Sequence, residues 1–358
     1  MGIKALANKL ELSISTVSRA LNSSGPVSAE TRQRVMDAAA ELGYSPNISA
    51  GNLRKGRVDT IGLMLPVYSQ AESHTLALFM GLADGIRSVL SRHQLDLAIF
   101  QSDSGSNELT QLKRIVGRRQ VDGLIVSNTR RHDQRLDFLA KQKFPFVAFG
   151  RSDSGGEHAW IDLDFESAVV VAVERLVGFN HRRIGIVMPG HDAMQAHIYL
   201  KSYKQILKRL NIGFDNNLVR YSEFSERGGY GAAESLLALE TPPTAILFQC
   251  DSMAIGAYRK LSEIGLKPGR DIAISTGVLT SQVPDYLSPR LTGFTLTVRE
   301  VGIRMGEAIL ARVPSVAAYF NSALIQEVWP LQLKAQSSDA MVIDTRQDQT
   351  APLTETVS

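Results

Sequence analysis

The chain has 358 residues, of which 44% are hydrophobic and 21% are charged, and its formal net charge is +3. This composition is typical of a globular protein with room for two or three packed units. The chain contains no run of about 18 apolar residues, which excludes a transmembrane helix. Its start lacks a secretory signal, and one cysteine, Cys250, excludes an intrachain disulfide. We therefore expect a cytoplasmic protein.

Positive charge is concentrated near the N-terminal end. Residues 1–57 contain eight Lys and Arg against four Asp and Glu, so the rest of the chain is close to neutral. A local basic excess beside a nearly neutral body is typical of a small nucleic-acid-binding head.

The first 22 residues predict two short helices joined by a turn. The apolar face of the first helix is formed by Ile3, Leu6, Ala7 and Leu10, and the same spacing returns at Val17, Ala20 and Leu21. The opposite face of the second helix carries Ser15, Thr16, Ser18, Arg19 and Asn22. Small polar side chains around one arginine suit a helix that enters the major groove of DNA. The alternative is an ordinary helix pair with a solvated face.

A third helix is predicted to begin after Ser28, which is a suitable N-cap residue. Its apolar stripe consists of Val35, Ala38, Ala39 and Leu42. Gly43 would end it, with Pro46 just beyond. The basic stretch 47–57 is then a linker, in which Gly51 lowers helix propensity by about 1 kcal/mol relative to Ala. Both a short helix and a flexible tether remain open.

From Thr60 onward, short apolar strands alternate with helices. Strands are expected at 60–66, 95–100, 123–126 and 146–149, with helices at 76–93, 107–119 and before 146. The pattern restarts after residues 161–163, with strands at 183–188, 245–249 and 272–275 and helices at 165–177 and before 210. This alternation predicts two α/β units with parallel sheets, whose strand ends surround a shared cleft.

Six motifs carry a family resemblance. They are residues 15–22 (STVSRALN), 27–32 (VSAETR), 41–47 (ELGYSPN), 121–125 (VDGLI), 180–184 (NHRRI) and 287–292 (LSPRLT). From residue 3 to about 333 the chain resembles the lactose/galactose repressor (LacI/GalR) family of bacterial transcription regulators. The resemblance implies an all-α helix-turn-helix head joined to an α/β periplasmic-binding-protein-like body of two doubly wound parallel-sheet subdomains.

The resemblance also implies domain boundaries. The head would span 1–45, the hinge 46–57 and the body 58–335. Within the body, the N-subdomain would contain about 58–160 and 291–320, and the C-subdomain about 161–290 and 321–335. Residues 336–358 would form a disordered tail.

In this family the protein is a homodimer that binds a near-palindromic operator in double-stranded DNA. The resemblance places Ile14, Ser15 and Arg19 at base edges. It places phosphate contacts at Thr16, Ser18, Asn22, Ser28, Thr31 and Asn47. The hinge would fold on DNA and insert Leu53 into the minor groove. Glu11, where the family usually has Gly, and Gly51 depart from the pattern.

The cleft would bind a small effector, which in this family is most often a sugar. The loops that match offer His74, Thr75, Asp103, Arg151, Trp160 and Asp162. Carboxylates and Arg can bind vicinal hydroxyls, and an aromatic ring can pack on a pyranose. Alternatively, Asp162 caps the following helix and Trp160 packs at the interface between the subdomains. Tyr199, Cys250 and Thr280 stand where the family often has Arg, Asn and Asp, so we expect a less charged pocket.

Two other classes of protein are disfavoured. A solute-binding protein of sugar transport would share the body, but the basic head and the missing signal peptide argue against it. An enzyme would need catalytic residues, and the chain has no P-loop, metal-spaced His/Cys cluster or Gly-x-Ser-x-Gly motif. We therefore expect no catalytic residues, cofactor, metal or membrane partner. The tail lacks a leucine heptad, which favours a dimer. The effector, the operator and the choice between repression and activation stay open.

Overall fold

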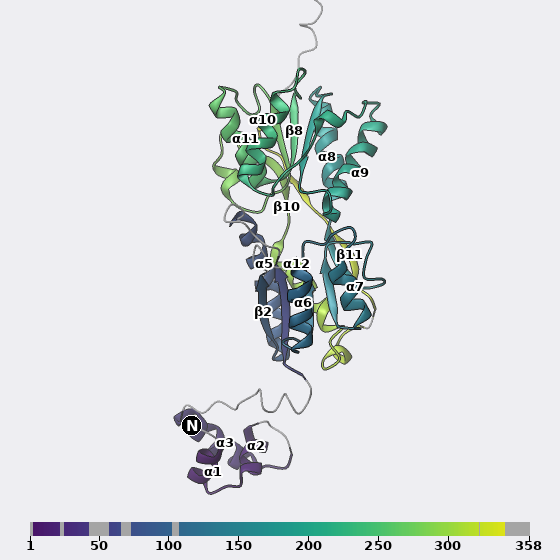
Figure 1. The fold of residues 1–358 in the computed structure, drawn as a ribbon. Helices are drawn as coiled ribbons and strands as arrows, with labels where there is room; N and C mark the ends of the chain where they lie inside the picture. Colours follow the sequence, from purple (N-terminus) through teal and green to yellow (C-terminus); the bar gives the residue numbers. More distant parts are fainter. Residues whose placement is uncertain are drawn as a thin grey trace, which may run out of the picture. The chain divides into compact units, whose positions relative to one another are not determined.

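The computed structural model describes residues 3–21, 25–42, 57–65, 73–101, 107–321 and 323–340, without the side chains of residues 73–75 (Figure 1). The chain divides into a first unit, Met1–Val58, and a second, Asp59–Ser358. The described helices include none that is long and apolar enough to cross a membrane.

In the described part of the first unit, three helices form a bundle: α1 (Ile3–Leu10), α2 (Ile14–Leu21) and α3 (Ala29–Glu41). Its core confirms the predicted apolar faces, because it consists of Leu6, Ala7, Val17, Ala20, Val35, Ala38 and Ala39. Ser28 caps α3 as predicted, since its hydroxyl accepts a hydrogen bond from the Thr31 N–H at 3.2 Å. Ser13 caps α2 in the same way through the Thr16 N–H at 3.1 Å.

Glu11 makes the turn between α1 and α2 with a φ of 54°, in the left-handed region. That conformation costs a residue with a Cβ about 1–2 kcal/mol. The departure from Gly noted in the sequence therefore falls where Gly would be favoured. The ion pair between Lys9 and Glu41, at 2.8 Å, ties α1 to α3 beside this turn.

The second unit contains two six-stranded sheets. The N-subdomain sheet has the order β11-β5-β4-β3-β1-β2, and all its described pairs are parallel. Its strands are β1 (Thr60–Leu65), β2 (Asp96–Gln101), β3 (Gly123–Val126), β4 (Phe146–Phe149), β5 (Ala159–Leu163) and β11 (Gln326–Trp329). Helices α5 (Ser73–Leu90) and α12 (Val298–Leu310) pack on one face, and α6 (Glu108–Gly117) and α7 (Gln134–Lys141) on the other. Successive side chains of a strand point to opposite faces of the sheet, so neighbouring residues pack against different pairs of helices.

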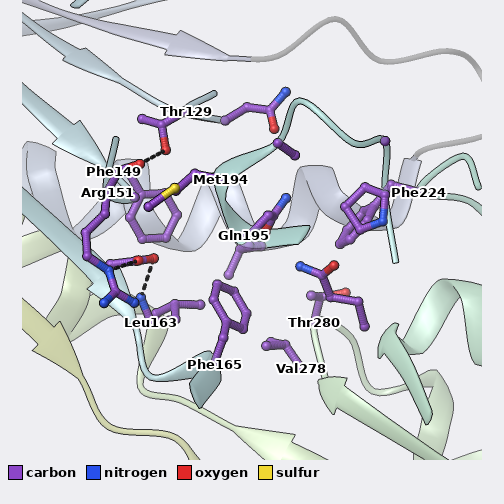
Figure 2. Close-up of a pocket in the computed structure, with 18 of the residues that line it drawn as sticks. Thr129, Phe149, Arg151, Leu163, Phe165, Met194, Gln195, Phe224, Val278 and Thr280 are labelled. Carbon is purple, nitrogen blue, oxygen red and sulfur yellow. Dashed lines mark hydrogen bonds and ion pairs between the residues drawn. The ribbon is translucent and has the colours of Figure 1, made fainter. Parts of the chain in front are cut away.

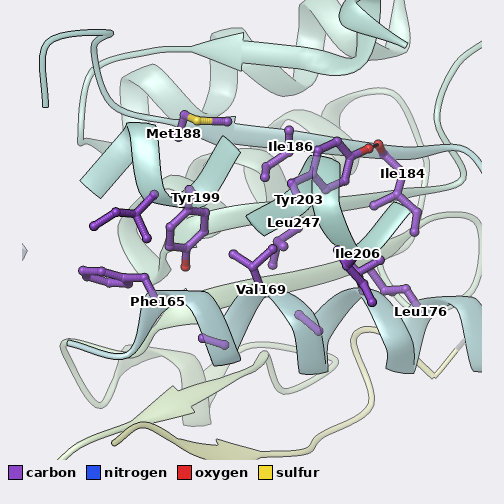
Figure 3. Packing of buried hydrophobic residues seen from close by; sticks show 14 of the residues in the cluster. Phe165, Val169, Leu176, Ile184, Ile186, Met188, Tyr199, Tyr203, Ile206 and Leu247 are labelled. Atoms are coloured by element: carbon purple, nitrogen blue, oxygen red, sulfur yellow. Dashed lines mark hydrogen bonds between the residues drawn. The ribbon is translucent and has the colours of Figure 1, made fainter. Parts of the chain in front are cut away.

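The C-subdomain sheet has the order β12-β10-β9-β8-β6-β7, parallel except for β12 beside β10. Its strands are β6 (Ile184–Met188), β7 (Val219–Tyr221), β8 (Ala245–Cys250), β9 (Ala273–Val278), β10 (Thr292–Thr295) and β12 (Gln332–Lys334). Helices α8 (Phe165–Gly178) and α9 (Met194–Arg209) cover one face, and α10 (Glu226–Leu237) and α11 (Asp251–Glu263) the other. Figure 3 shows the α8/α9 core, where Tyr203 donates a hydrogen bond to the Ile184 carbonyl at 2.6 Å.

The two α/β units are confirmed, but their limits differ from those expected. Strands β5 and β11 pair with each other and lie in the N-subdomain sheet, so the chain crosses after Leu163 and again after Trp329. Between these two crossings the chain returns to the N-subdomain, between β10 and α12. This return lies after Thr295, whereas the expected boundary lies near 290. Sequence periodicity predicts a strand but does not say which sheet it joins.

The expectation that a disordered tail begins at residue 336 is wrong for residues 336–340, which the structure describes. Ser338 and Asp339 are fully buried in the C-subdomain. Asp339 forms an ion pair with Arg175 at 2.7 Å, and Ser338 donates a hydrogen bond to the Ile274 carbonyl at 2.6 Å. These short polar residues do not form a periodic element, which is why the pattern alone did not mark them as ordered. Residues 341–358 lie outside the described residues.

Candidate nucleic-acid interface and ligand cleft

Helix α2 presents the predicted polar face to the surface of the first unit. Ile14 is 44% exposed, Ser15 and Arg19 are also exposed, and Val17 and Ala20 are buried beneath them. The Arg19 Nε donates to the Ser15 carbonyl, one turn back, at 3.1 Å. This contact aligns the arginine along the outer face of α2.

The remaining predicted contacts of the head fall into two groups. Ser28 is exposed at the start of α3, and Thr16, Ser18 and Thr31 are partly exposed. The other three lie outside the described residues: Asn22, Asn47 and Leu53. Their roles stay predictions.

A cavity of about 330 Å³ lies in the second unit, where loops that follow parallel strands of the two subdomains meet (Figure 2). The N-subdomain contributes α5, the loop after β3, the end of β4 and β5. The C-subdomain contributes the starts of α8 and α9, the loops after β6 and β7, the end of β8, and the end of β9 with the loop that follows it. This edge of an open α/β sheet is where ligands bind, and the volume lies near the lower end of the roughly 300–1,000 Å³ of small-molecule sites.

The N-subdomain side of the cavity holds one arginine, which is already paired. The Arg151 Nε contacts the Asp162 carboxylate at 2.7 Å, and a terminal nitrogen contacts Glu166 at 2.8 Å. Burial alone would lower the pKa of Arg151, but Glu166 and Asp162 outweigh it and raise that pKa above its ordinary value. The guanidinium also lies 5.8 Å from the centre of the Trp160 ring.

The rest of the lining is largely apolar. The aromatic members are Phe79, Phe149, Phe165 and Phe224, joined by Leu163, Met194 and Val278. Phe79 and Phe149 meet edge to face with their ring centres 6.4 Å apart. The cavity therefore offers flat apolar surfaces from both subdomains.

Several buried polar atoms on the C-subdomain side have no hydrogen-bond partner within the described residues. Gln249, at the end of β8, is 1% exposed, and neither atom of its side-chain amide is bonded. The hydroxyls of Tyr199 and Ser275 are also buried and have no hydrogen-bond partner within the described residues. The Tyr199 hydroxyl lies against Gly277, where a Cβ would overlap it. Buried polar groups in proteins are nearly always paired, so this cluster is unusual.

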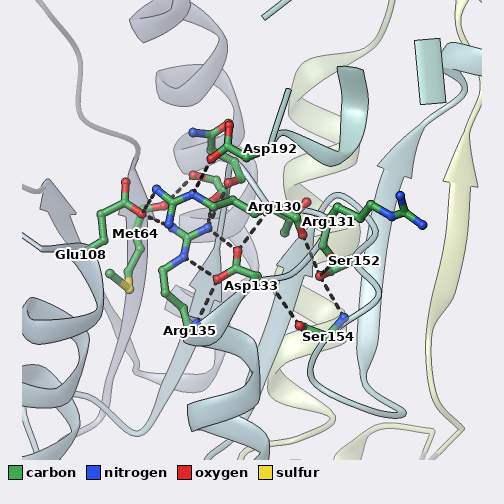
Figure 4. A network of polar contacts seen from close by, with 12 residues as sticks. Met64, Glu108, Arg130, Arg131, Asp133, Arg135, Ser152, Ser154 and Asp192 are labelled. Atoms are coloured by element: carbon green, nitrogen blue, oxygen red, sulfur yellow. Dashed lines mark hydrogen bonds and ion pairs between the residues drawn. The ribbon is translucent and has the colours of Figure 1, made fainter. Parts of the chain in front are cut away.

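Backbone pairing joins the two rims of the cavity. The Arg131 N–H donates to the Asp192 carbonyl at 2.9 Å, and the Met194 N–H donates to the Thr129 carbonyl at 3.1 Å. The Arg130 Nε also contacts the Asp192 carboxylate at 3.2 Å (Figure 4). We call residues 129–131 together with 192–194 the rim clasp.

A buried ionic network supports the rim clasp from the N-subdomain (Figure 4). Arg135 is 2% exposed and contacts Asp133 at 2.7 Å and Glu108 at 3.2 Å. Glu108 also contacts Arg130 at 3.1 Å. Burial alone would raise the pKa of Asp133, but Arg135 outweighs it and holds that pKa below its ordinary value.

The structure brings three of the predicted cleft residues to the cavity: Arg151, Asp162 and Thr280. The Thr280 hydroxyl donates to the Asp251 carboxylate at 2.7 Å. Asp162 does not cap α8, because that role belongs to Asp164, which accepts from the Ser167 N–H at 3.0 Å. His74 and Thr75 lie in the first turn of α5 without described side chains, and Asp103 lies outside the described residues.

The predictions for Trp160, Tyr199 and Cys250 need correction, because none of them lines the cavity. Trp160 packs against the α6/α7 core of the N-subdomain, and Tyr199 is buried in the α8/α9 core. Cys250 points into the α10/α11 core, where burial raises the pKa of its thiol to about 12. Sequence reasoning missed Gln249 and the four phenylalanines. A polar residue that ends an apolar strand is the signal that could have found Gln249.

Comparisons with known proteins agree with this arrangement. A family model described as bacterial regulatory proteins, lacI family, matches residues 3–47, and a periplasmic binding protein-like domain matches residues 173–327. The HTH-type transcriptional regulator AglR of Rhizobium meliloti is 30% identical over 343 residues, covering 94% of both chains. RafR of Escherichia coli, another such regulator, is 33% identical over 273 residues, covering 76% of this chain and 79% of RafR.

Solved structures share the fold. A complex of the transcriptional regulator CelR with cellobiose superposes with a TM-score of 0.70 at 24% identity, covering 94% of this chain and 99% of that one. A Lac repressor dimer bound to operator and an anti-inducer superposes with a TM-score of 0.81 at 23% identity, covering 96% and 99%. At these identities the likeness concerns the fold alone.

Proposed function

The chain belongs to the lacI family of bacterial regulatory proteins and is a DNA-binding transcriptional regulator, and we propose that it is a homodimeric repressor controlled by a sugar in its cleft. The observation that carries the proposal is the presence in one chain of the exposed α2 face and of the cavity at the carboxyl ends of the strands. The first suits DNA, and the second suits a small effector.

On DNA, α2 would lie in the major groove of each half-site. Arg19 and Ser15 would face base edges, with Ile14 beside them. Ser28 and Thr31 would contact the phosphate backbone from the start of α3. Two heads related by dimer symmetry would then read a near-palindromic operator.

The sugar proposal is supported by the lining and by the solved relatives. Aromatic side chains and hydrogen-bonding groups together suit a sugar. CelR was solved with cellobiose, and another lacI-family regulator, from Enterococcus faecium, with ribose. An effector that prefers one arrangement of the subdomains would shift the equilibrium between arrangements, with the rim clasp at the point of movement.

Selection of DNA from a random pool by the full chain, followed by mobility shifts, tests the proposal. We expect an enriched near-palindromic motif that at least one sugar weakens or strengthens. Arg19→Ala should reduce affinity by about 5-fold to 150-fold, the loss of one bidentate base contact of about 1–3 kcal/mol.

Arg118→Ala is the matched control, because Arg118 is an exposed arginine at the end of α6 in the body. Its affinity for the motif should equal that of the wild type. Failure to enrich any motif would contradict the proposal, and wild-type affinity of Arg19→Ala would remove the assigned role of that residue.

A further inference from the structure

The charges around the cavity determine what kind of ligand it accepts. Arg151 is the only Lys or Arg among the described residues that line it, and two carboxylates already pair with it. Glu223 adds negative charge to the lining, and so does Asp192, which pairs with Arg130 outside the lining. The sequence stretches 66–72 and 102–106, which lie outside the described residues, contain no Lys or Arg.

A ligand that carries a phosphate or carboxylate would therefore lose water without gaining a cation. Desolvation of an anion is costly unless a positive group pairs with it, and nearby carboxylates add repulsion. An uncharged ligand avoids both costs. The lining thus disfavours sugar phosphates and sugar acids on electrostatic grounds.

The unpaired amide of Gln249 supplies the complementary feature. An amide side chain both donates and accepts hydrogen bonds, which matches a sugar hydroxyl pair. Along β8, Ala245 and Leu247 face the α8/α9 core, and the alternation of side chains places Gln249 on that same face, at the strand end that lines the cavity. Both amide atoms are buried and unbonded, so a ligand hydroxyl could bond them without displacing a protein partner.

The aromatic side chains explain how an uncharged ligand gains affinity. Phe149 and Phe79 come from the N-subdomain, and Phe165 and Phe224 come from the C-subdomain. Figure 2 shows Phe149, Phe165 and Phe224 around the cavity. Such rings can pack on the apolar face of a pyranose. Apolar contact from both sides and a neutral hydrogen-bonding group together suit an uncharged sugar.

We infer that the cleft selects uncharged sugars against their phosphorylated or carboxylated counterparts, and that Gln249 is the residue that recognises their hydroxyls. This inference rests on the proposed function, because it assumes that the effector enters this cavity. To that function it adds discrimination against charged ligands, which we call the charge rule, and Gln249 as a residue that determines specificity.

Calorimetric titration and thermal melting of the full chain test the charge rule. The probes are pairs that differ in charge: glucose and glucose 6-phosphate, trehalose and trehalose 6-phosphate, and galactose and galacturonate, with cellobiose and ribose as further neutral sugars. We expect at least one neutral sugar to bind, and the charged member of its pair to bind about 10-fold more weakly or worse. Equal or tighter binding of the charged member, or no binding of any neutral sugar, would overturn the inference.

Gln249→Met tests the residue. The substitution removes both polar atoms and keeps a side chain of similar length, so affinity for the neutral sugar should fall about 10-fold or more. The ligand-free protein should melt at the same temperature or higher, because no internal hydrogen bond is lost. Gln205→Met, on the exposed face of α9, is the matched control and should change neither property.

Unchanged sugar affinity of Gln249→Met, or a lower melting temperature without ligand, would show that Gln249 is structural. Operator binding measured on the same preparations separates the two proposals. Intact operator binding with a preference for charged ligands would overturn this inference alone, and absence of sequence-specific DNA binding would overturn the proposed function.

Discussion

The two walls of the cleft differ in how their buried polar groups are paired. The N-subdomain wall contains full charges, and each one named above has partners: Arg151 lies between two carboxylates, and Arg135 between Asp133 and Glu108. The C-subdomain wall carries the Asp192 and Glu223 carboxylates and a neutral group, Gln249, whose amide has no partner within the described residues. Behind this wall, in the α8/α9 core, the Tyr199 hydroxyl has no described partner either. The named charges of the N-subdomain are thus paired without a ligand, whereas the Gln249 amide gains a hydrogen bond when a ligand supplies one. Substitutions should therefore have opposite consequences on the two walls.

The largest effect is expected from Asp133→Asn on the N-subdomain wall. The variant leaves Arg135 buried without its bidentate partner, which should lower the free energy of unfolding by about 3–5 kcal/mol. Urea denaturation measures this. Asp153→Asn is the control, because the Asp153–Arg131 pair is half-exposed and should contribute less than about 1 kcal/mol. Similar losses in both variants would contradict the role of burial.

The same carboxylate predicts a pH dependence. Because the folded-state pKa of Asp133 lies below its ordinary value, its contribution is fully present above that ordinary value. The contribution is lost as the pH falls through the folded-state pKa. Acid titration of stability should therefore be shallower in Asp133→Asn than in the wild type.

Gly277→Ala should give the next largest effect, on the C-subdomain wall. The new methyl group would overlap the Tyr199 hydroxyl and crowd the Gln249 carbonyl, so we expect a loss of about 1–3 kcal/mol. Gly231→Ala is the same substitution in α10, where no atom lies within 4 Å of the added Cβ. Helix propensity should make that variant more stable by up to about 1 kcal/mol. A loss at Gly231 as large as at Gly277 would contradict the packing argument.

Two tyrosines on α9 provide a smaller and sharper comparison. Tyr203→Phe removes the bond to the Ile184 carbonyl and should cost about 1 kcal/mol. Tyr199→Phe removes a hydroxyl without a described partner and should leave stability unchanged or slightly higher. Thermal melting of the ligand-free variants measures both. Equal losses would show that the Tyr199 hydroxyl is bonded in solution.

The smallest effect on stability is expected at the rim clasp. Asp192→Asn removes an ion pair with an exposed carboxylate, so the free energy of unfolding should fall by less than about 1 kcal/mol. Effector affinity should fall by a factor of about 2–5, because the pair helps to hold the rims together. Arg130→Gln should reduce effector affinity in the same way and lower stability further, because it also removes the pair with Glu108. High salt should remove the difference in effector affinity between Asp192→Asn and the wild type. If only Asp192→Asn lowered effector affinity, the result would indicate that Asp192 contacts the ligand directly.

Local pattern determined a large part of this protein. The three helices of the head, the Ser28 cap and strands β3 and β4 follow from apolar spacing and capping chemistry, which act within a few residues. Of the predicted cleft residues, Arg151, Asp162 and Thr280 were named from the family resemblance, and the structure places them at the cavity.

Where two adjacent residues end a strand, only the tertiary structure decided which of them faces the cavity. Gln249 and Cys250 are adjacent, yet the period of two along β8 sends Gln249 toward the cleft side and Cys250 into the α10/α11 core. Likewise, β5 and β11 are separated by more than 160 residues and pair only because the chain crosses between subdomains. The sequence by itself predicted the three helices of the head, the alternation of strands and helices in the body, and the exposed polar face of α2. Long-range pairing and the layer that covers each sheet face decided which side chains meet a ligand, because those contacts join residues far apart in the chain.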